Sequence, residues 1–180
     1  MKLILHIGMG KTGTSSIQNA LRTSSVELAE QNVQYLGMWF DAIDPRFNGS
    51  LGTREFFALD EEAMQSAATL FLENLNRINA ERGIETFVLS NEAIFGAVHR
   101  IKPFILALCE QIDVKIVIYI RDPHSWLPSA YTQWSLYHKS VKGPLRSFSE
   151  HAPELLSMYQ NIEHWLNDFS DHIIARPHIS

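Results

Sequence analysis

Short apolar runs alternate with amphipathic stretches along most of the chain. The apolar runs are short enough to be strands, and they cover residues 2–8, 33–36, 86–89, 114–120 and 172–175. The stretches between them place apolar side chains near helical spacing, and they cover residues 14–31, 60–82, 101–112, 123–140 and 153–169. Strands that alternate with helices pack as a parallel sheet with helices on both faces, so the pattern predicts an α/β fold.

Capping residues mark the ends of two of the expected helices. Asp60 suits the start of the helix at 60–82, and Gly83 suits its end. Asp122 followed by Pro123 is a cap and first-turn proline for the helix at 123–140, and Pro128 is expected to kink it. Residues 37–58 contain three glycines, one proline and several aromatic residues, and we expect an ordered loop region there.

Bulk composition is that of a globular domain. The chain has 180 residues, of which 46% are hydrophobic and 19% charged, so a single domain over 1–180 is expected. A net charge of −5 disfavours general nucleic-acid binding, and no apolar run reaches the length of a membrane span. Cys109 is the one cysteine and cannot form an internal disulfide, so nothing indicates an oxidising compartment and a cytoplasmic location is expected.

A glycine-rich segment joins the first predicted strand to the first predicted helix. Residues 8–16 read Gly-Met-Gly-Lys-Thr-Gly-Thr-Ser-Ser, and the glycines allow tight turns and a close approach of the backbone to a ligand. The first N–H groups of the helix have no partner inside it and point toward an anion. The charge of Lys11 and the neighbouring hydroxyls favour an anion too. The segment predicts a phosphate-binding loop; a glycine-rich turn without a ligand is the alternative.

A second basic motif follows the strongest predicted strand. Arg121 stands where that strand ends, and Ser129 lies eight residues further on, nearly two turns along the expected helix. Parallel sheets bind ligands at the carboxyl ends of their strands, and the arginine fork suits a phosphate. On its own, Arg121 is better explained by pairing with Asp122 or by capping carbonyl groups.

Both motifs resemble those of sulfotransferases that use 3′-phosphoadenosine 5′-phosphosulfate (PAPS). Residues 11–15 resemble the K-[ST]-G-T-[TS] loop that binds the 5′-phosphosulfate, and residues 121–131 resemble the R-[DN]-P-x₅-S-x-Y motif that binds the 3′-phosphate. An ordinary Walker A motif differs, because its lysine follows the last glycine whereas Lys11 precedes Gly13. The resemblance covers residues 3–22 and 85–135 well. It implies a P-loop NTPase-like three-layer sandwich.

The resemblance also assigns roles to residues. It implies that the 5′-phosphosulfate is held by the loop residues Gly10, Lys11, Thr12, Gly13, Thr14, Ser15 and Ser16. It implies that Arg121 and Ser129 hold the 3′-phosphate. PAPS is then the co-substrate and a hydroxyl of a carbohydrate or small molecule is the acceptor. No metal is expected, since the sulfuryl group carries less charge than a phosphoryl group and no acidic strand end resembles a Walker B magnesium ligand.

Sulfuryl transfer needs a base for the acceptor hydroxyl, and two residues are candidates. Glu92 follows the strand at 86–89, whose end a parallel sheet places beside the loop, and carbohydrate sulfotransferases often use a glutamate. A glutamate stabilised by the dipole of a helix start is an equally good interpretation. His6 is the second candidate, because cytosolic small-molecule sulfotransferases use histidine. Its place inside the first strand favours a hydrogen-bonded core histidine.

Further alternatives stay open at this point. Trp126, Trp134 and Tyr137 belong either to the wall of an acceptor cleft or to the core. A P-loop small-molecule kinase and a non-catalytic nucleotide-binding module are the competing functions. The family usually continues beyond a strand such as 172–175, so a domain truncated at its C-terminal end is expected. The pattern leaves the acceptor and the oligomeric state unspecified.

Overall fold

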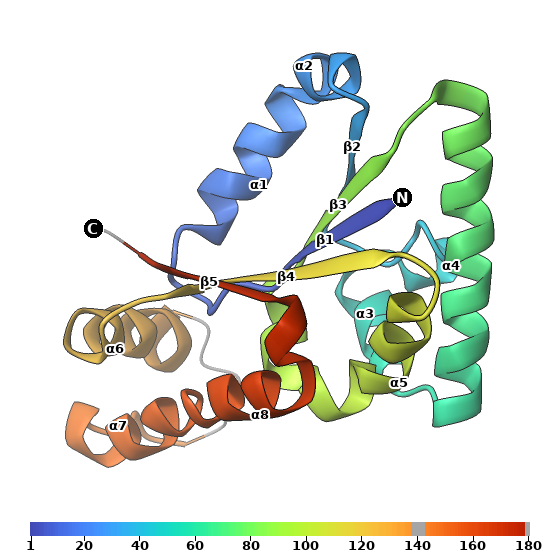
Figure 1. Cartoon of the computed structure of the whole chain (residues 1–180). Coiled ribbons are helices and arrows are strands. Elements are labelled where there is room, and N and C mark those ends of the chain that lie inside the picture. The colour runs from blue at the N-terminus through green and yellow to red at the C-terminus, as the bar shows by residue number, and fades with distance from the viewer. Residues whose placement is uncertain (138–142, 179–180) are drawn as a thin grey trace.

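The computed structural model is a parallel β-sheet with helices packed on both of its faces (Figure 1). It describes residues 1–137 and 143–178. In this part of the chain the sheet has five strands in the order β2-β3-β1-β4-β5. The strands are β1 (Lys2–His6), β2 (Val33–Gly37), β3 (Thr86–Ser90), β4 (Asp113–Ile120) and β5 (Ile173–Pro177). The predicted α/β fold with a parallel sheet is confirmed.

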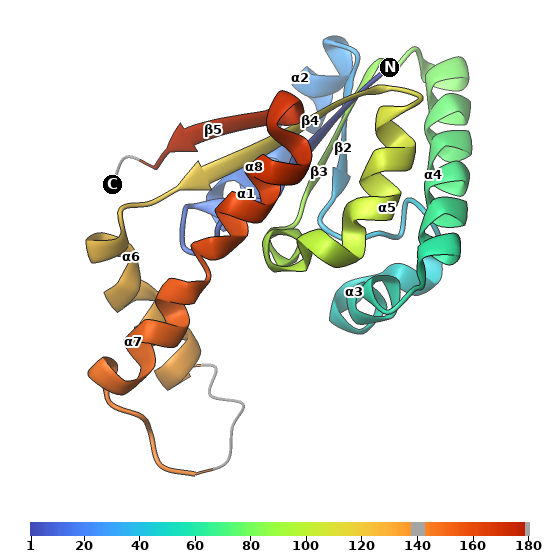
Figure 2. The same cartoon turned by 60° about the horizontal axis from the view of Figure 1, so that its bottom comes forward.

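The helices form the outer layers. The α-helices are α1 (Thr14–Thr23), α2 (Ser25–Glu30), α3 (Gly49–Phe57), α4 (Glu61–Arg82), α5 (Val98–Cys109), α6 (Pro123–Ala130), α7 (Phe148–Ser157) and α8 (Gln160–Phe169). Shorter elements are the 3₁₀ helices η1 (Pro45–Phe47), η2 (Glu92–Ala97) and η4 (Ser170–His172) and the π-helix η3 (Tyr131–Tyr137). Figures 1 and 2 show α1 and α2 on one face of the sheet and α4, α5 and α8 on the other.

The strand β1 lies at the centre of the sheet, between β3 and β4. Helices cover its faces, and three of its five side chains are buried: Leu3, Leu5 and His6 are 0%, 1% and 3% exposed. Burial of an aliphatic side chain of this size contributes about 1.5–3 kcal/mol, so the centre of the sheet is strongly fixed. The register sets His6 beside Ser90 of β3 and Val117 of β4. The chain therefore leaves β1 at the carboxyl edge of the sheet, next to the ends of both neighbours.

Capping chemistry places several helix ends where the sequence predicts them. The carboxylate of Asp60 accepts a hydrogen bond from the backbone of Ala63 at the start of α4, and Gly83, in the left-handed conformation, ends that helix. Asp122 caps α6 in the same way, through the backbone N–H of Ser125. The predicted helix at 60–82 and the predicted start at 123 are confirmed.

The region 37–58 is not the loop that the sequence predicts, because it contains η1 and α3. An aromatic cluster stabilises this region: the rings of Phe40 and Phe56 stack with centroids 4.1 Å apart, and Phe56 also contacts Phe104 of α5. Gly52 permits the close packing of α3 on η1, since a Cβ there would lie 2.3 Å from the backbone of Phe47. Gly52, one of the glycines that indicated a loop, therefore serves helix packing.

Several predicted helices are interrupted or shifted. The helix at 14–31 breaks between α1 and α2, where the Thr23 hydroxyl bonds the carbonyls of Asn19 and Ala20. The helix at 123–140 changes from α6 to η3 shortly after Pro128, which lacks the N–H that continues an α-helix; its predicted end lies outside the described residues. The helix at 153–169 is two helices, and a capping box of Ser147 and Glu150 starts the first one earlier. The helix at 101–112 spans Val98–Cys109 instead.

Candidate functional site

The segment from Gly8 to Gly13 forms a compact turn between β1 and α1. Its start continues the pairing of β1, because the N–H groups of Ile7 and Met9 donate to the backbone of β4. Gly13 is the N-cap of α1 with φ of 80°, and Lys11 also has a left-handed backbone with φ of 70°, which is uncommon for a residue other than glycine. The turn therefore presents the N-terminus of a ten-residue helix, whose first N–H groups have no partner inside the helix.

The segment that follows β4 holds this loop in place. A guanidinium N–H of Arg121 donates to the carbonyl of Lys11 at 3.3 Å, and the indole N–H of Trp126 donates to the carbonyl of Gly10 at 2.7 Å. A Cβ at Gly10 would lie 2.9 Å from the ring of Trp134, so glycine is required for this approach. The two predicted basic residues, Lys11 and Arg121, thus lie together, although 110 residues separate them in sequence.

Polar side chains spaced four residues apart follow Arg121 along α6 and η3. Arg121 donates to the hydroxyl of Ser125 at 3.2 Å, and the ammonium of Lys11 donates to the side-chain carbonyl of Gln133 at 2.6 Å. A cavity of about 460 Å³ lies beside the loop and is lined by Lys11, Ser129, Thr132, Gln133 and Tyr137. Ser129 therefore shares a cavity with Lys11. Arg121, which precedes Ser129 in the chain, contacts the backbone of the loop instead.

Glu92 lies at the carboxyl end of β3, against the first helix. It is half-buried and begins η2, after Asn91, whose N–H donates to the carbonyl of His6. The amide of Gln18 on α1 donates both to the Glu92 carboxylate, at 3.1 Å, and to the carbonyl of Ser90, at 3.0 Å. Glu92 therefore stands next to the helix that carries the loop, and it also begins a helix, so both interpretations of this residue remain.

His6 is buried in the sheet directly below the loop, with 3% of its surface exposed. Its Nδ1 atom is 2.7 Å from the hydroxyl of Ser90, and its ring meets that of Tyr119 edge-on. Burial lowers the pKa of His6 from its ordinary value of 6.5, and the charge of Glu92 opposes this shift. The ring is therefore neutral near pH 7. Within residues 1–137 and 143–178, its Nε2 atom has no hydrogen-bond partner, and neither has the buried hydroxyl of Thr14.

The three aromatic residues after Arg121 divide between core and cavity. Trp126 is fully buried and belongs to the hydrophobic core, so its ring does not line a cleft. Trp134 is partly buried and packs against Trp126 and Gly10. Tyr137 lines the cavity beside Lys11 and is 84% exposed.

Two glutamines complete the site, and the sequence analysis missed both. Gln18 contacts Glu92 across 74 positions of sequence, and Gln133 contacts Lys11 across 122 positions. An amide side chain on a helix gives no local signal of such a contact. The signal available was spacing: Gln18 lies one helical turn after Thr14, and Gln133 lies four residues after Ser129.

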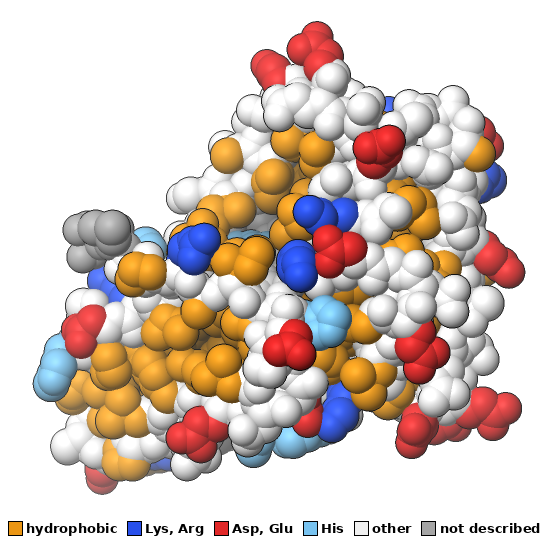
Figure 3. Space-filling view, viewed as in Figure 1, with side chains coloured by type: hydrophobic (Ala, Val, Ile, Leu, Met, Phe, Trp, Pro, Cys, Tyr) orange, Lys and Arg blue, Asp and Glu red, His pale blue; other side chains and the backbone are white. Residues whose placement is uncertain are grey.

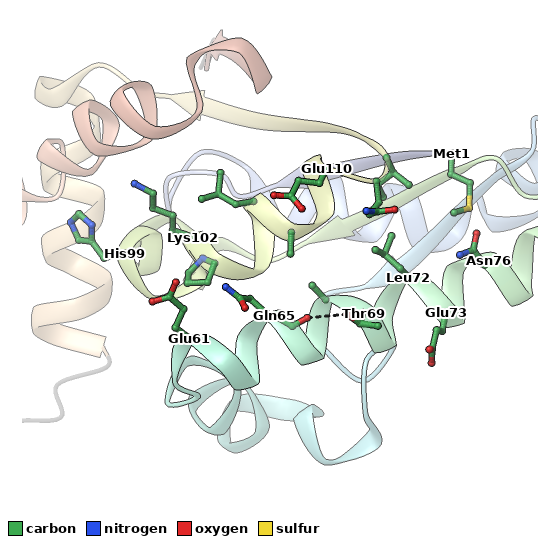
Figure 4. Close-up of a pocket in the computed structure, with 16 residues that line it drawn as sticks. Met1, Glu61, Gln65, Thr69, Leu72, Glu73, Asn76, His99, Lys102 and Glu110 are labelled. Atoms are coloured by element: carbon green, nitrogen blue, oxygen red, sulfur yellow. Dashed lines mark hydrogen bonds between the residues drawn. The ribbon is translucent and has the colours of Figure 1, made fainter.

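A larger hollow of about 1250 Å³ lies elsewhere, between α4 and α5 (Figure 4). Figure 4 shows polar side chains from both helices along it, among them Glu61, Gln65 and Glu73 of α4 and Lys102 of α5. None of the predicted site residues lines this groove.

Among the described residues, no three His, Cys, Asp or Glu side chains lie close enough together to bind a metal ion. The helices in this part of the chain are too short or too polar to span a membrane.

A glycine-rich loop follows the central strand, and an arginine from the end of the neighbouring strand lies against it. Many α/β domains bind ligands at such strand ends. Comparison with protein families narrows this class. The model of a family described as "Sulfotransferase domain" matches residues 3–177, which is nearly the whole chain. The protein therefore belongs to the sulfotransferase domain family, whose members transfer sulfuryl groups. A search of curated proteins found no match.

Proposed function

We propose that the protein transfers a sulfuryl group from PAPS to a hydroxyl of a carbohydrate or small-molecule acceptor. The observation that carries this proposal is the contact between the two basic motifs: Arg121 donates to the backbone of Lys11, and the Lys11 side chain lines one cavity with Ser129. A doubly phosphorylated nucleotide is held best by two cationic groups that lie close to each other. Lys11 lines the cavity, and Arg121 contacts the backbone of the loop next to it.

The residues present fit such a ligand. Two buried polar atoms at the loop, His6 Nε2 and Thr14 Oγ1, have no partner in the part of the chain that the structure describes, as expected where a bound group supplies one. Lys11 and the loop N–H groups would hold the 5′-phosphosulfate, through the residues Gly10, Lys11, Thr12, Gly13, Thr14, Ser15 and Ser16. Arg121 and Ser129 would hold the 3′-phosphate, and the exposed hydroxyl of Ser125 lies between them.

The chemistry assigns one task to each group. When bound, PAPS supplies an activated sulfuryl group, whose S–O bond to the 5′-phosphate breaks as the acceptor oxygen bonds to sulfur. Lys11 neutralises the charge that develops on the leaving phosphate oxygen, as in phosphoryl transfer. Glu92 accepts the proton of the acceptor hydroxyl, and Gln18 orients its carboxylate.

Thermal unfolding with added nucleotides tests the proposal. Adenosine 3′,5′-bisphosphate (PAP), the product nucleotide, at 100 times its dissociation constant should stabilise the protein by about 2.7 kcal/mol. ATP with magnesium should stabilise it less. The opposite order would favour a small-molecule kinase. Stabilisation by PAP without sulfuryl transfer from PAPS to a panel of sugar and phenol acceptors would favour a non-catalytic module.

A further inference from the structure

The side chain of Tyr159 lies against the segment that carries Arg121. Tyr159 stands between α7 and α8, 38 positions beyond Arg121 in sequence, and its hydroxyl donates to the backbone carbonyl of Arg121 at 2.7 Å. Its ring meets that of Trp126 edge-on, with the ring centroids 5.3 Å apart. One half-buried residue outside both phosphate motifs therefore contacts two residues of the segment that follows β4.

Those two residues are also the ones that reach the phosphate loop. The guanidinium of Arg121 donates to the carbonyl of Lys11, and the indole N–H of Trp126 donates to the carbonyl of Gly10. The backbone of Lys11 is left-handed, with φ of 70°, and such a conformation persists only where the surrounding structure holds it. Tyr159 therefore stands behind both contacts that hold the loop at this point.

The hydroxyl of Tyr159 serves as a hydrogen-bond donor and not as a base. Burial raises the pKa of Tyr159 to about 12; the charge of Asp122 adds to this shift, and the charge of Arg121 opposes it. The hydroxyl is therefore protonated at neutral pH. The residue is the N-cap of α8, but its hydroxyl points to Arg121 rather than to the start of that helix.

The bond to the carbonyl fixes the peptide plane that follows Arg121. This plane lies where β4 ends and α6 is about to begin, next to the cap residue Asp122. The peptide planes beside a Cα set the direction in which its side chain leaves the backbone, so a small rotation displaces the far end of an arginine most. Misplacement of a binding group by about 1 Å can cost up to about a hundredfold in rate. Tyr159 can thus affect a ligand through Arg121 without touching it.

We propose that Tyr159 is a positioning residue, which orients the guanidinium of Arg121 toward the 3′-phosphate and so sets the preference for PAP over adenosine 5′-monophosphate (5′-AMP). This inference rests on the proposed function and extends it to the junction of α7 and α8. The hydroxyl acts through Arg121 on the 3′-phosphate alone. The ring supports Trp126, and with it the loop that serves both nucleotides.

Isothermal titration calorimetry with PAP and with 5′-AMP separates these two parts of the side chain. Tyr159→Phe keeps the ring and removes the donor, so PAP affinity should fall about three- to tenfold, while 5′-AMP affinity stays unchanged. Tyr159→Leu also removes the ring from Trp126 and should weaken the binding of both nucleotides. Trp165→Phe is the matched control on α8, because the buried indole of Trp165 donates to the carbonyl of Phe95 at 3.0 Å, away from the site. It should leave both affinities unchanged.

A double-mutant cycle tests whether Tyr159 acts through Arg121. In the Arg121→Lys background the planar fork is gone, so Tyr159→Phe should cost little further PAP affinity. Losses that add in the double variant would show that Tyr159 acts elsewhere, and would overturn the inference. Circular dichroism and urea unfolding of each variant separate lost binding from lost folding.

A measurement on the wild-type protein does not depend on the folding of Tyr159→Phe. With 3-fluorotyrosine in place of the five tyrosines, the ¹⁹F signal of Tyr159 should shift on addition of PAP and stay in place with 5′-AMP. Variants with phenylalanine at each of the other four positions identify that signal. A Tyr159 signal that responds equally to both nucleotides would contradict the inference.

The outcome for the inference differs from that for the proposed function. If Tyr159→Phe keeps the wild-type ratio of PAP affinity to 5′-AMP affinity, the inference is wrong, whether both affinities stay the same or fall together. An equal fall is what general support of the fold predicts. Wild-type protein that binds no PAP would instead overturn the proposed function.

Discussion

The phosphate loop and the groove between α4 and α5 differ in how they are built. The groove has a volume of about 1250 Å³, against about 460 Å³ for the cavity beside Lys11. Most of its lining comes from two adjacent helices, and its acidic side chains project from their exposed faces. At the loop, three strand ends far apart in sequence bring Lys11, Glu92 and Arg121 to one edge of the sheet.

This difference shows why volume alone is a poor guide to function. Side chains of the groove meet solvent or ordinary partners, such as the ion pair of Lys102 and Asp168 at 2.6 Å. At the loop, two buried polar atoms lack hydrogen-bond partners among the described residues, and a lysine adopts a left-handed backbone. Features of this kind cost free energy in a folded protein and are concentrated at functional sites. Matched residues from the two regions should therefore respond differently to substitution.

The largest effect is expected from the lysines. Lys11→Ala removes the charge proposed to stabilise the leaving group, so kcat/KM for PAPS should fall roughly a hundred- to a thousandfold. Lys102→Ala, in the groove, removes a half-exposed ion pair and should change activity by less than about twofold and stability by at most about 1 kcal/mol. Steady-state kinetics measures the first value and urea unfolding the second. Equal losses of kcat/KM in the two variants would show that the loop and the groove do not differ in their importance for activity.

Substitution of Glu92 and of Glu110 should have unequal effects on turnover, by a factor slightly smaller than that for the lysines. Glu92→Gln keeps the size of the side chain and removes the proposed base, so turnover should fall by about a hundredfold. Its affinity for PAP should not change, because the base contacts the acceptor. Glu110→Gln is the control in the groove. If turnover is unchanged in Glu92→Gln, Glu92 is not the base, and its role is to stabilise the start of a helix.

The arginine is tested by removal of a phosphate from the ligand. Arg121→Lys loses the planar fork that donates two parallel bonds, and should weaken PAP binding by about tenfold. Binding of 5′-AMP, which has no 3′-phosphate, should be the same in wild type and variant. Arg100→Lys on α5 is the matched control. If calorimetry finds that Arg121→Lys loses the same affinity for PAP and for 5′-AMP, Arg121 does not bind the 3′-phosphate.

The smallest expected effect is the contribution of His6 to the pH dependence of folding stability. Because the folded-state pKa of His6 lies below 6.5, the unfolded chain takes up a proton first as the pH falls. The contribution of His6 to stability is therefore complete above pH 6.5 and declines below it. Wild type should lose more stability than His6→Gln between pH 7.5 and 5.5, measured as urea midpoints. The exposed His99→Gln is the control; parallel curves for wild type and His6→Gln would contradict the prediction.

The sequence predicts the sheet and the two basic motifs well because both depend on local signals. Buried strands appear as apolar runs, and Gly13 and Asp122 mark helix starts directly. The helix α3 was missed because its stability comes from contacts between distant aromatic residues, such as Phe56 with Phe104. Gly52 gave the wrong signal, since its role there is close packing.

Within the candidate site, contacts across the sheet were beyond sequence reasoning. His6 was predicted to be a hydrogen-bonded core histidine, and Ser90 is the partner, but only the register of β1 and β3 reveals it. The amides of Gln18 and Gln133 likewise reach partners that are far away in sequence. The roles of the site residues in binding and catalysis stay predictions, as does the expected truncation of the domain.

Hydrophobic side chains gather on the surface over α6–α8 (Figure 3). Leu156 and Leu166 are among the exposed ones, at 40% and 45%. Polar contacts on the inside, such as the hydroxyl of Tyr159 on the carbonyl of Arg121 at 2.7 Å, keep this segment against the sheet. The same helices also bury apolar side chains in the core, among them Trp126, Leu155 and Trp165.

Because Trp126 donates a hydrogen bond to the carbonyl of Gly10, tryptophan fluorescence should be sensitive to the conformation of the loop. Of the four tryptophans, Trp126 and Trp134 both touch Gly10, so a change in the loop alters the surroundings of two indole rings. Indole emission responds to hydrogen bonding and to nearby charge. The intrinsic fluorescence of the unlabelled protein should therefore report nucleotide binding in real time.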